Sequence, residues 1–126
     1  MQKFILILLA LAYFYFNNSS AAIICPSISS IKSSHLSGWN FLNALTDEPA
    51  DTEQIHLFQQ TAEYFDQAEW SSDYINGNSH CYYASTAEVF LAKESLGPEK
   101  NNFWQEIGSD FWRCKSTNIA DCQFRL

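Results

Sequence analysis

Four cysteines limit the possible folds of this chain more than any other feature of its sequence. An even number of cysteines in a small exported domain is typical of a disulfide framework, and four cysteines allow three pairings. A metal site is the alternative, but the sequence has no Cys-x-x-Cys motif and its three histidines are scattered. Distance along the chain favours one local link near the C-terminus and one long link. The pairs that we expect are Cys114–Cys122 and Cys25–Cys81.

The first 22 residues have the layout of a secretory signal peptide. Lys3 provides a positive charge, an uninterrupted apolar run extends from Phe4 to Phe16, and Ser20-Ala21-Ala22 offers small residues for cleavage. The run is short for a bilayer span, so an uncleaved N-terminal anchor is the less favoured alternative. We therefore expect residues 1–22 to be removed. Residues 23–126 then form one disulfide-stapled domain, periplasmic or extracellular, without stable membrane insertion.

The exported part of the chain is strongly acidic. The whole chain has 14 Asp and Glu, seven Lys and Arg, and a net charge of −7. Removal of Lys3 with the signal makes that charge more negative still. Nucleic acid is not an expected partner, because phosphate binding requires a basic surface. An acidic surface suits a basic protein partner, cations, or a solvated face that binds nothing. We expect no cofactor and no metal.

The segment after the cleavage site predicts a short helix followed by an ambiguous stretch. Proline is favoured in the first turn of a helix, and Pro26 is followed by Ile28 and Ile31, which would share one helical face. One or two helical turns are therefore expected next to Cys25. Residues 39–42 fit either a strand or the start of a helix, and their periodicity does not separate the two.

A helix and a strand are expected in succession after an acidic loop. Asp51 can cap a helix and form a capping box with Gln54, and apolar residues follow at helical spacing. We place the helix from about Thr52 to Ala62 and a strand over residues 64–70. Alternation of aromatic and polar residues leaves the state of residues 52–64 open between helix and strand.

The central part of the chain predicts a β-hairpin with a cysteine in its second strand. Asn76-Gly77 tolerates the positive φ that a tight primed turn requires. His80 to Tyr83 have high β-propensity, and residues 89–91 return as a further strand. Farther along, residues 103–107 have helical spacing, and residues 111–114 are apolar and extended. The predicted fold is an α+β domain with an antiparallel sheet of three to four strands, short helices and two disulfides.

Several short motifs occur along the chain, namely Cys25-Pro26-Ser27 with Ile31, Gly38-Trp39, Phe65 with Ala68 and Trp70, Cys81-Tyr82-Tyr83, and Cys114 with Asp121-Cys122 and Phe124. Together they resemble the motifs of a family of small exported proteins from Gram-negative bacteria. The family carries a cysteine-containing domain of unknown function and occurs in intracellular pathogens and their relatives. The resemblance implies export and a small disulfide-bearing fold, and it implies no activity and no catalytic residues.

Arrangements that would indicate an enzyme are weak in this sequence. His80 precedes Cys81, but neighbouring side chains of a strand point to opposite faces, so this histidine cannot activate that thiol. The nucleophile-elbow motif Gly-x-Ser-x-Gly is absent, although a dispersed Ser-His-Asp arrangement stays open. Pairs of carboxylates such as Asp66 and Glu69 are expected on any acidic surface. Residues 47–53 lack the spacing and the glycine of a calcium loop.

Aromatic residues suggest the one candidate binding site. Tyr and Trp are enriched at binding surfaces, because they combine apolar area with a polar group. The alternative is that they fill the core of a small domain with few aliphatic residues. We expect a non-catalytic exported binding or accessory protein, with an acidic inhibitor of a basic hydrolase such as lysozyme, or a small hydrolase, as alternatives. The predicted patch consists of Trp70, Tyr74, Tyr82 and Tyr83.

Overall fold

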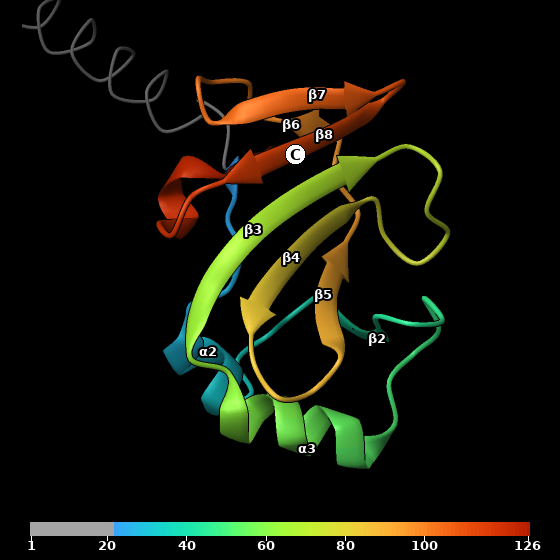
Figure 1. The fold of residues 1–126 in the computed structure, drawn as a ribbon, viewed down its shortest axis with the longest axis vertical. Helices are drawn as coiled ribbons and strands as arrows, with labels where there is room; N and C mark the ends of the chain where they lie inside the picture. Colours follow the sequence, from blue (N-terminus) through green and yellow to red (C-terminus); the bar gives the residue numbers. More distant parts are fainter. Residues whose placement is uncertain (1–21) are drawn as a thin grey trace, which may run out of the picture.

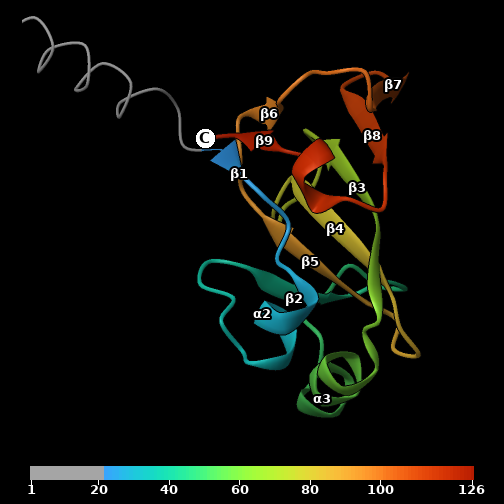
Figure 2. The same cartoon turned by 90° about the vertical axis from the view of Figure 1, so that its left-hand side faces the viewer.

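The structure is a computed structural model that describes residues 22–126. The predicted signal peptide falls almost entirely outside the described residues. Two antiparallel sheets, two short α-helices and one 3-10 turn make up the described part (Figure 1). Figure 2 shows both α-helices at the end of the larger sheet that is opposite the β7–β8 hairpin. None of the helices in residues 22–126 is long and apolar enough to cross a membrane.

The antiparallel α+β fold is confirmed, but the predicted sheet of three to four strands is too small. The chain before the central hairpin and the chain after it both add strands to the sheet, and the two ends of the described chain pair in a second sheet. In spatial order the larger sheet consists of β2 (Asn40–Asn43), β5 (Val89–Lys93), β4 (Ser79–Ala84), β3 (Tyr64–Ser71), β8 (Phe111–Lys115) and β7 (Trp104–Gly108). The smaller sheet consists of β1 (Ala22–Ile23), β9 (Phe124–Arg125) and β6 (Gly97–Pro98).

The segment after Phe103 is a strand, although its apolar spacing predicts a helix. Trp104 is buried and pairs with Cys114 of β8, whereas Gln105 and Ile107 are exposed. A helix here would have buried only part of its apolar face. Pairing with β8 satisfies the backbone and buries the tryptophan, so a contact between two segments overrides the local spacing.

The helix α3 (Thr52–Thr61) forms where the sequence predicts it. The N–H of Gln54 donates to the carboxylate of Asp51 (2.8 Å), and the N–H of Asp51 donates to the side-chain oxygen of Gln54 (3.0 Å). This reciprocal pair is the expected capping box. Phe58 is fully buried and anchors the helix to the core. The next strand begins at Tyr64, as expected.

The helix α2 (Ile28–Lys32) confirms the predicted helical turn near the N-terminal cysteine. Its N-cap is Ser27, whose hydroxyl accepts a hydrogen bond from the N–H of Ser30 (3.2 Å). Pro26 therefore precedes the cap and does not occupy the predicted first helical position. The ambiguous stretch that follows is extended and forms β2.

The connection between β3 and β4 is a loop over residues 72–78, the β3–β4 loop, so the predicted tight turn is wrong. The N–H of Ser71 donates to the carbonyl of Asn78 (3.0 Å) and closes the loop. Gly77 has a φ of +122°, but Asn76 lacks the positive φ of a primed turn. A Cβ on Gly77 would lie 2.8 Å from the backbone nitrogen of Lys93, so the glycine allows close packing against β5.

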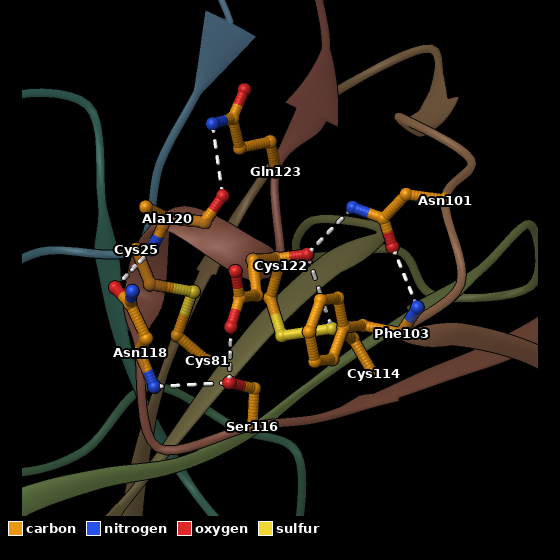
Figure 3. The surroundings of a disulfide bond; sticks show 11 residues. Cys25, Cys81, Asn101, Phe103, Cys114, Ser116, Asn118, Ala120, Cys122 and Gln123 are labelled. Atoms are coloured by element: carbon orange, nitrogen blue, oxygen red, sulfur yellow. Dashed lines mark hydrogen bonds between the residues drawn. A yellow bond between two sulfur atoms is a disulfide. The ribbon is translucent and has the colours of Figure 1, made fainter.

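Both expected disulfides are present, and residues 22–126 contain no free cysteine. Cys25–Cys81 ties the N-terminal segment to the centre of β4 over a separation of 56, and Cys114–Cys122 closes a local loop with a separation of 8. Figure 3 shows that the N–H of Asn118 donates to the hydroxyl of Ser116 (3.1 Å) within that loop. All four cysteines are buried in the main core. Such links are typical of an oxidising compartment.

The larger sheet has apolar clusters on both of its faces. The main core lies on the face that carries Cys81 and the fully buried Ala68 and Leu91. A second, smaller cluster lies on the opposite face and contains Leu42 and Phe90. The β3–β4 loop belongs to this second face, because its Tyr74 packs against His80, which contacts Phe90 of the second cluster. The candidate site is built there.

Candidate functional site

The structure separates the four aromatic residues of the predicted patch. Tyr82 and Tyr83 are neighbours in β4, so their side chains point to opposite faces. Tyr83 is 8% exposed, and its hydroxyl donates to the carbonyl of Pro26 (2.5 Å). Trp70 packs half-buried against the same main core. Tyr74 and Tyr82 lie on the second face, so the four residues do not form one surface.

An aromatic cluster packs between the β3–β4 loop and the second face of the larger sheet, and it consists of Tyr74, His80, Tyr82 and Phe90. The ring centroid of Tyr74 lies 4.3 Å from that of His80. His80 lies 4.7 Å from Phe90, and Phe90 stacks on Tyr82 at 5.2 Å. The cluster therefore connects the loop to β4 and β5. Aromatic pairs at these separations contribute beyond the area that they bury.

His80 is the centre of this aromatic cluster and is 1% exposed. Its Nε2–H donates to the carbonyl of Gly77 (2.8 Å), and its Nδ1 accepts a hydrogen bond from the Tyr82 hydroxyl (3.2 Å). Burial lowers the pKa of His80, and this effect exceeds the opposing influence of the Gly77 carbonyl and the Glu69 carboxylate. The imidazole is therefore neutral at pH 7. Both of its nitrogens are engaged, Nε2 with the loop and Nδ1 with Tyr82 of β4.

Two asparagines attach the β3–β4 loop to other parts of the chain. The side-chain amide of Asn78 donates to the carbonyl of Ser95 (3.0 Å), and the N–H of Ser95 donates back to the Asn78 side-chain oxygen (2.8 Å). The side-chain amide of Asn76 donates to the carbonyl of Asp47 (3.1 Å). The last bond joins the loop to the segment between β2 and α3. The C-terminal half of the loop is thus held by the fold.

A pocket of about 330 Å³, the loop pocket, lies between the β3–β4 loop and the segment after β2. Figure 1 shows both of these connections on the right-hand side of the sheet. Ile75 at its margin is 96% exposed. Burial, together with the nearby carboxylates of Asp47, Glu69 and Asp73, raises the pKa of Tyr74. The pocket is lined by Leu42, Thr46, Asp47, Glu48, Asp73, Tyr74, Ile75 and Asn76.

The lining of the loop pocket combines negative charge with apolar surface. Three of its residues are carboxylates, and no Lys or Arg is among them. A second hollow of about 330 Å³ shares Leu42 and Asn76 with it and is mainly apolar, with Trp39 and Pro49 in its wall. The two hollows therefore form one continuous surface. Such a surface suits a ligand that carries both cationic and apolar groups.

No catalytic arrangement is found among the residues that the structure describes. His80 is buried with both nitrogens engaged, and Cys81 is in a disulfide. His35 contacts the hydroxyl of Ser33 (2.8 Å), but that hydroxyl also lies 2.8 Å from the Ser29 carbonyl, within a single exposed turn. Glu69 forms an ion pair with Arg113 (3.0 Å). Residues 22–126 contain no group of three or more residues suited to hold a metal ion.

Comparison of the chain with protein-family models, curated proteins and solved structures finds no match. The resemblance to small exported proteins of Gram-negative bacteria therefore stays a prediction.

Several residues of this site are not evident from the sequence. Ile75 and Asp47 are far apart in the chain, and the pairing of β2 with β5 brings their segments together. In the sequence, His80 is notable only as a neighbour of Cys81. Its hydrogen bond to the loop depends on the path of residues 72–78, which the sequence does not reveal. The acidic run after Thr46 is the one signal in the sequence that points to this location.

Proposed function

We propose that this chain is an exported, non-catalytic binding protein, and that its loop pocket holds a basic protein partner. The observation that carries the proposal is the exposure of Ile75 on a loop that the fold holds in place. The same loop borders three carboxylates that have no basic neighbour in the pocket lining. A partner would fill the pocket with a Lys or Arg side chain and cover the isoleucine.

A fixed loop favours binding because little conformational freedom remains to be lost. Ordering a flexible interface side chain costs about 0.5–1.5 kcal/mol. The β3–β4 loop is already ordered by His80 beneath Gly77 and by the two hydrogen bonds between Asn78 and Ser95. Burying an exposed isoleucine contributes roughly 1.5–3 kcal/mol. Ile75 therefore suits the apolar centre of an interface.

The charge of the pocket determines the chemistry of the partner. Asp47, Glu48 and Asp73 line a concave surface, where partial exclusion of water strengthens their attraction for a cation. Arginine can meet such carboxylates with two parallel hydrogen bonds. The chain as a whole carries a net charge of −7, which would accelerate its encounter with a basic protein. The two disulfides support an encounter outside the cytoplasm, and the predicted signal would direct the protein to the periplasm or the exterior of the cell.

A photo-crosslinking experiment tests the proposal, because it captures whichever protein contacts Ile75. A benzophenone amino acid replaces Ile75 in the protein expressed with its signal in the cells that produce it. We expect an ultraviolet-dependent adduct with a basic protein. The double variant Asp47→Asn with Asp73→Asn should weaken that adduct, because it removes charge from the pocket without changing side-chain size.

The matched control places the same benzophenone at Leu96, which is 67% exposed and does not line the loop pocket. The proposal requires the adduct at position 75 and its absence at position 96. The same adduct at both positions, an acidic partner, or no adduct at position 75 would each contradict it.

A second candidate function is inhibition of a basic hydrolase such as lysozyme. It is favoured by the shape of the site, since an exposed apolar residue at the tip of a fixed, acidic loop could enter the substrate cleft of such an enzyme. A stoichiometric excess of the protein should then slow lysozyme, and Ile75→Asp should relieve the inhibition. Full lysozyme activity in that excess, at both low and physiological salt, would exclude lysozyme as the target.

A further inference from the structure

The two edges of the larger sheet differ in how they are protected. The β2 edge is covered by the chain itself, because Leu42 forms a bridge with Pro49 and the N–H of Ala50 donates to the carbonyl of Phe41 (2.9 Å). At the other end of the strand order, β7 has β8 on one side and, among residues 22–126, no strand on the other. Figure 2 shows β7 as the outermost strand at the upper right.

The sequence of β7 lacks the residues that most often block strand addition, although its pairing with β8 has a bulge between Glu106 and Gly108. It contains no proline and no lysine, and Glu106 is its single charged residue. Alternate residues of an edge strand direct their N–H and C=O groups away from the sheet. Within the described chain, Trp104 is the one residue of β7 whose N–H bonds outside the ladder, to the carbonyl of Asn101 (3.3 Å). The edge is therefore open to an added strand.

A second pocket, the edge pocket, lies beside this open strand and has a volume of about 390 Å³. Phe103 and Ile107 contribute apolar surface and are 46% and 45% exposed. Gln105 lies between them in the sequence and lines the same pocket, as alternation along a strand requires. Side chains of an added strand would project over these residues. The pocket is lined by Asn102, Phe103, Gln105, Ile107, Arg113 and Lys115.

The residues that line the edge pocket carry positive charge, in contrast to the negative net charge of the chain. Arg113 and Lys115 are both in the lining, and no Asp or Glu is among the lining residues. Lys100 lies over the ring of Trp112 (4.8 Å), and Arg113 pairs with Glu69. Lys115 has no ion-pair partner within the described residues. Charge complementarity therefore favours an acidic ligand at this edge.

We propose that β7 binds an extended, acidic and apolar segment of a partner polypeptide, which adds a seventh strand to the sheet. Backbone hydrogen bonds to β7 would hold the segment, apolar side chains would cover Phe103 and Ile107, and a carboxylate would approach Lys115. This mode of recognition takes its affinity from the main chain and its specificity from alternate side chains. A second copy of this chain is a poorer occupant, because pairing of two β7 edges would bring two basic pocket linings together.

Titration with a synthetic peptide tests the proposal. The probe is an acetylated, amidated, fluorescein-labelled octapeptide of alternating Glu and Val, measured by fluorescence anisotropy at physiological salt. We expect saturable binding, with new protection of the β7 amides in hydrogen exchange. Lys115→Glu should weaken binding by about tenfold or more, a change that corresponds to about 1.4 kcal/mol. The variant Lys93→Glu makes the same charge change at a residue that does not line the edge pocket, and it should bind as the parent does.

Two further peptides separate strand addition from general charge attraction. A probe with N-methyl groups on every backbone amide should lose binding, because it has no N–H donor on either edge with which to pair. A probe with Lys in place of Glu should bind at least about tenfold more weakly. Equal binding of the N-methylated probe, equal effects of Lys115→Glu and Lys93→Glu, a dimer formed through β7 in scattering measurements, or no binding of the parent probe would each overturn the proposal.

Discussion

The ring centroid of Tyr74 lies 4.3 Å from that of His80, so the loop that exposes Ile75 rests on a buried imidazole. His80 also donates a hydrogen bond to the carbonyl of Gly77 at the far end of the same loop. One side chain therefore supports the loop at two points. The stability of the proposed binding surface depends on the state of this histidine.

Acidification should weaken the fold through His80. Its pKa in the folded protein lies below the ordinary value of about 6.5, because burial disfavours the charged ring. The resulting stability is fully present above that ordinary value and is lost as the pH falls through the folded pKa. The carboxylates of Glu69 and Asp47 oppose this effect but do not reverse it. Between pH 7.5 and 5.5, the parent should lose about 1 kcal/mol more of its unfolding free energy than His80→Gln does.

Urea titrations at both pH values measure this difference, and His56→Gln is the matched control because His56 is exposed on α3. The control should keep the pH dependence of the parent. Identical pH dependence in the parent and in His80→Gln would show that His80 does not couple protonation to folding.

Gly77→Ala should destabilise the protein more than Gly38→Ala. Both glycines have positive φ, so each alanine incurs a backbone strain of about 1–2 kcal/mol. A Cβ at Gly77 would also lie 2.8 Å from the backbone nitrogen of Lys93, whereas a Cβ at Gly38 would meet the flexible end of the Lys93 side chain at 3.2 Å. Thermal unfolding checks the order. Equal losses would mean that close packing against β5 is not what requires Gly77.

Removal of the long disulfide should cost more than removal of the short one. Chain entropy gives about 4 kcal/mol for the Cys25–Cys81 loop and about 2.5 kcal/mol for the Cys114–Cys122 loop. Replacing each pair by alanine and measuring urea unfolding tests the order. A larger loss for the C-terminal pair would indicate that the local loop, which Ser116 and Asn118 stabilise, matters more than the long link.

Both disulfide pairings could be predicted from distance along the chain, and the capping box of α3 from two residues three apart. These features depend on local chemistry. The strand β7 could not be predicted, because its pairing with β8 is not visible in the spacing of Phe103 and Ile107. The length of the β3–β4 loop could not be predicted either. Asn76-Gly77 indicates a tight turn in the sequence, but Gly77 is required by its close contact with β5 and not by a turn.

The division of the predicted aromatic patch could have been foreseen. The alternation along a strand that separates His80 from Cys81 also separates Tyr82 from Tyr83. One tyrosine must therefore face the core if the other faces the loop. The position of Tyr74 above His80 could not be foreseen, because it depends on how the β3–β4 loop crosses the sheet.

Tyr83→Phe should reduce the unfolding free energy by about 1 kcal/mol, because it leaves the buried carbonyl of Pro26 without its hydrogen bond. Tyr64→Phe is the control, since Tyr64 is 54% exposed and should show almost no change. Chemical denaturation of the two variants measures the effect. An equal loss in both would mean that the hydroxyl of Tyr83 does not contribute through Pro26.

Backbone order parameters from nitrogen-15 relaxation test most directly whether Ile75 is presented on a loop that is fixed before any partner binds. If the aromatic cluster and the two asparagines hold the loop, the amides of residues 74–78 should have order parameters near those of the sheet, about 0.85. Values below about 0.6 for these amides, with the sheet still rigid, would contradict a preformed binding surface.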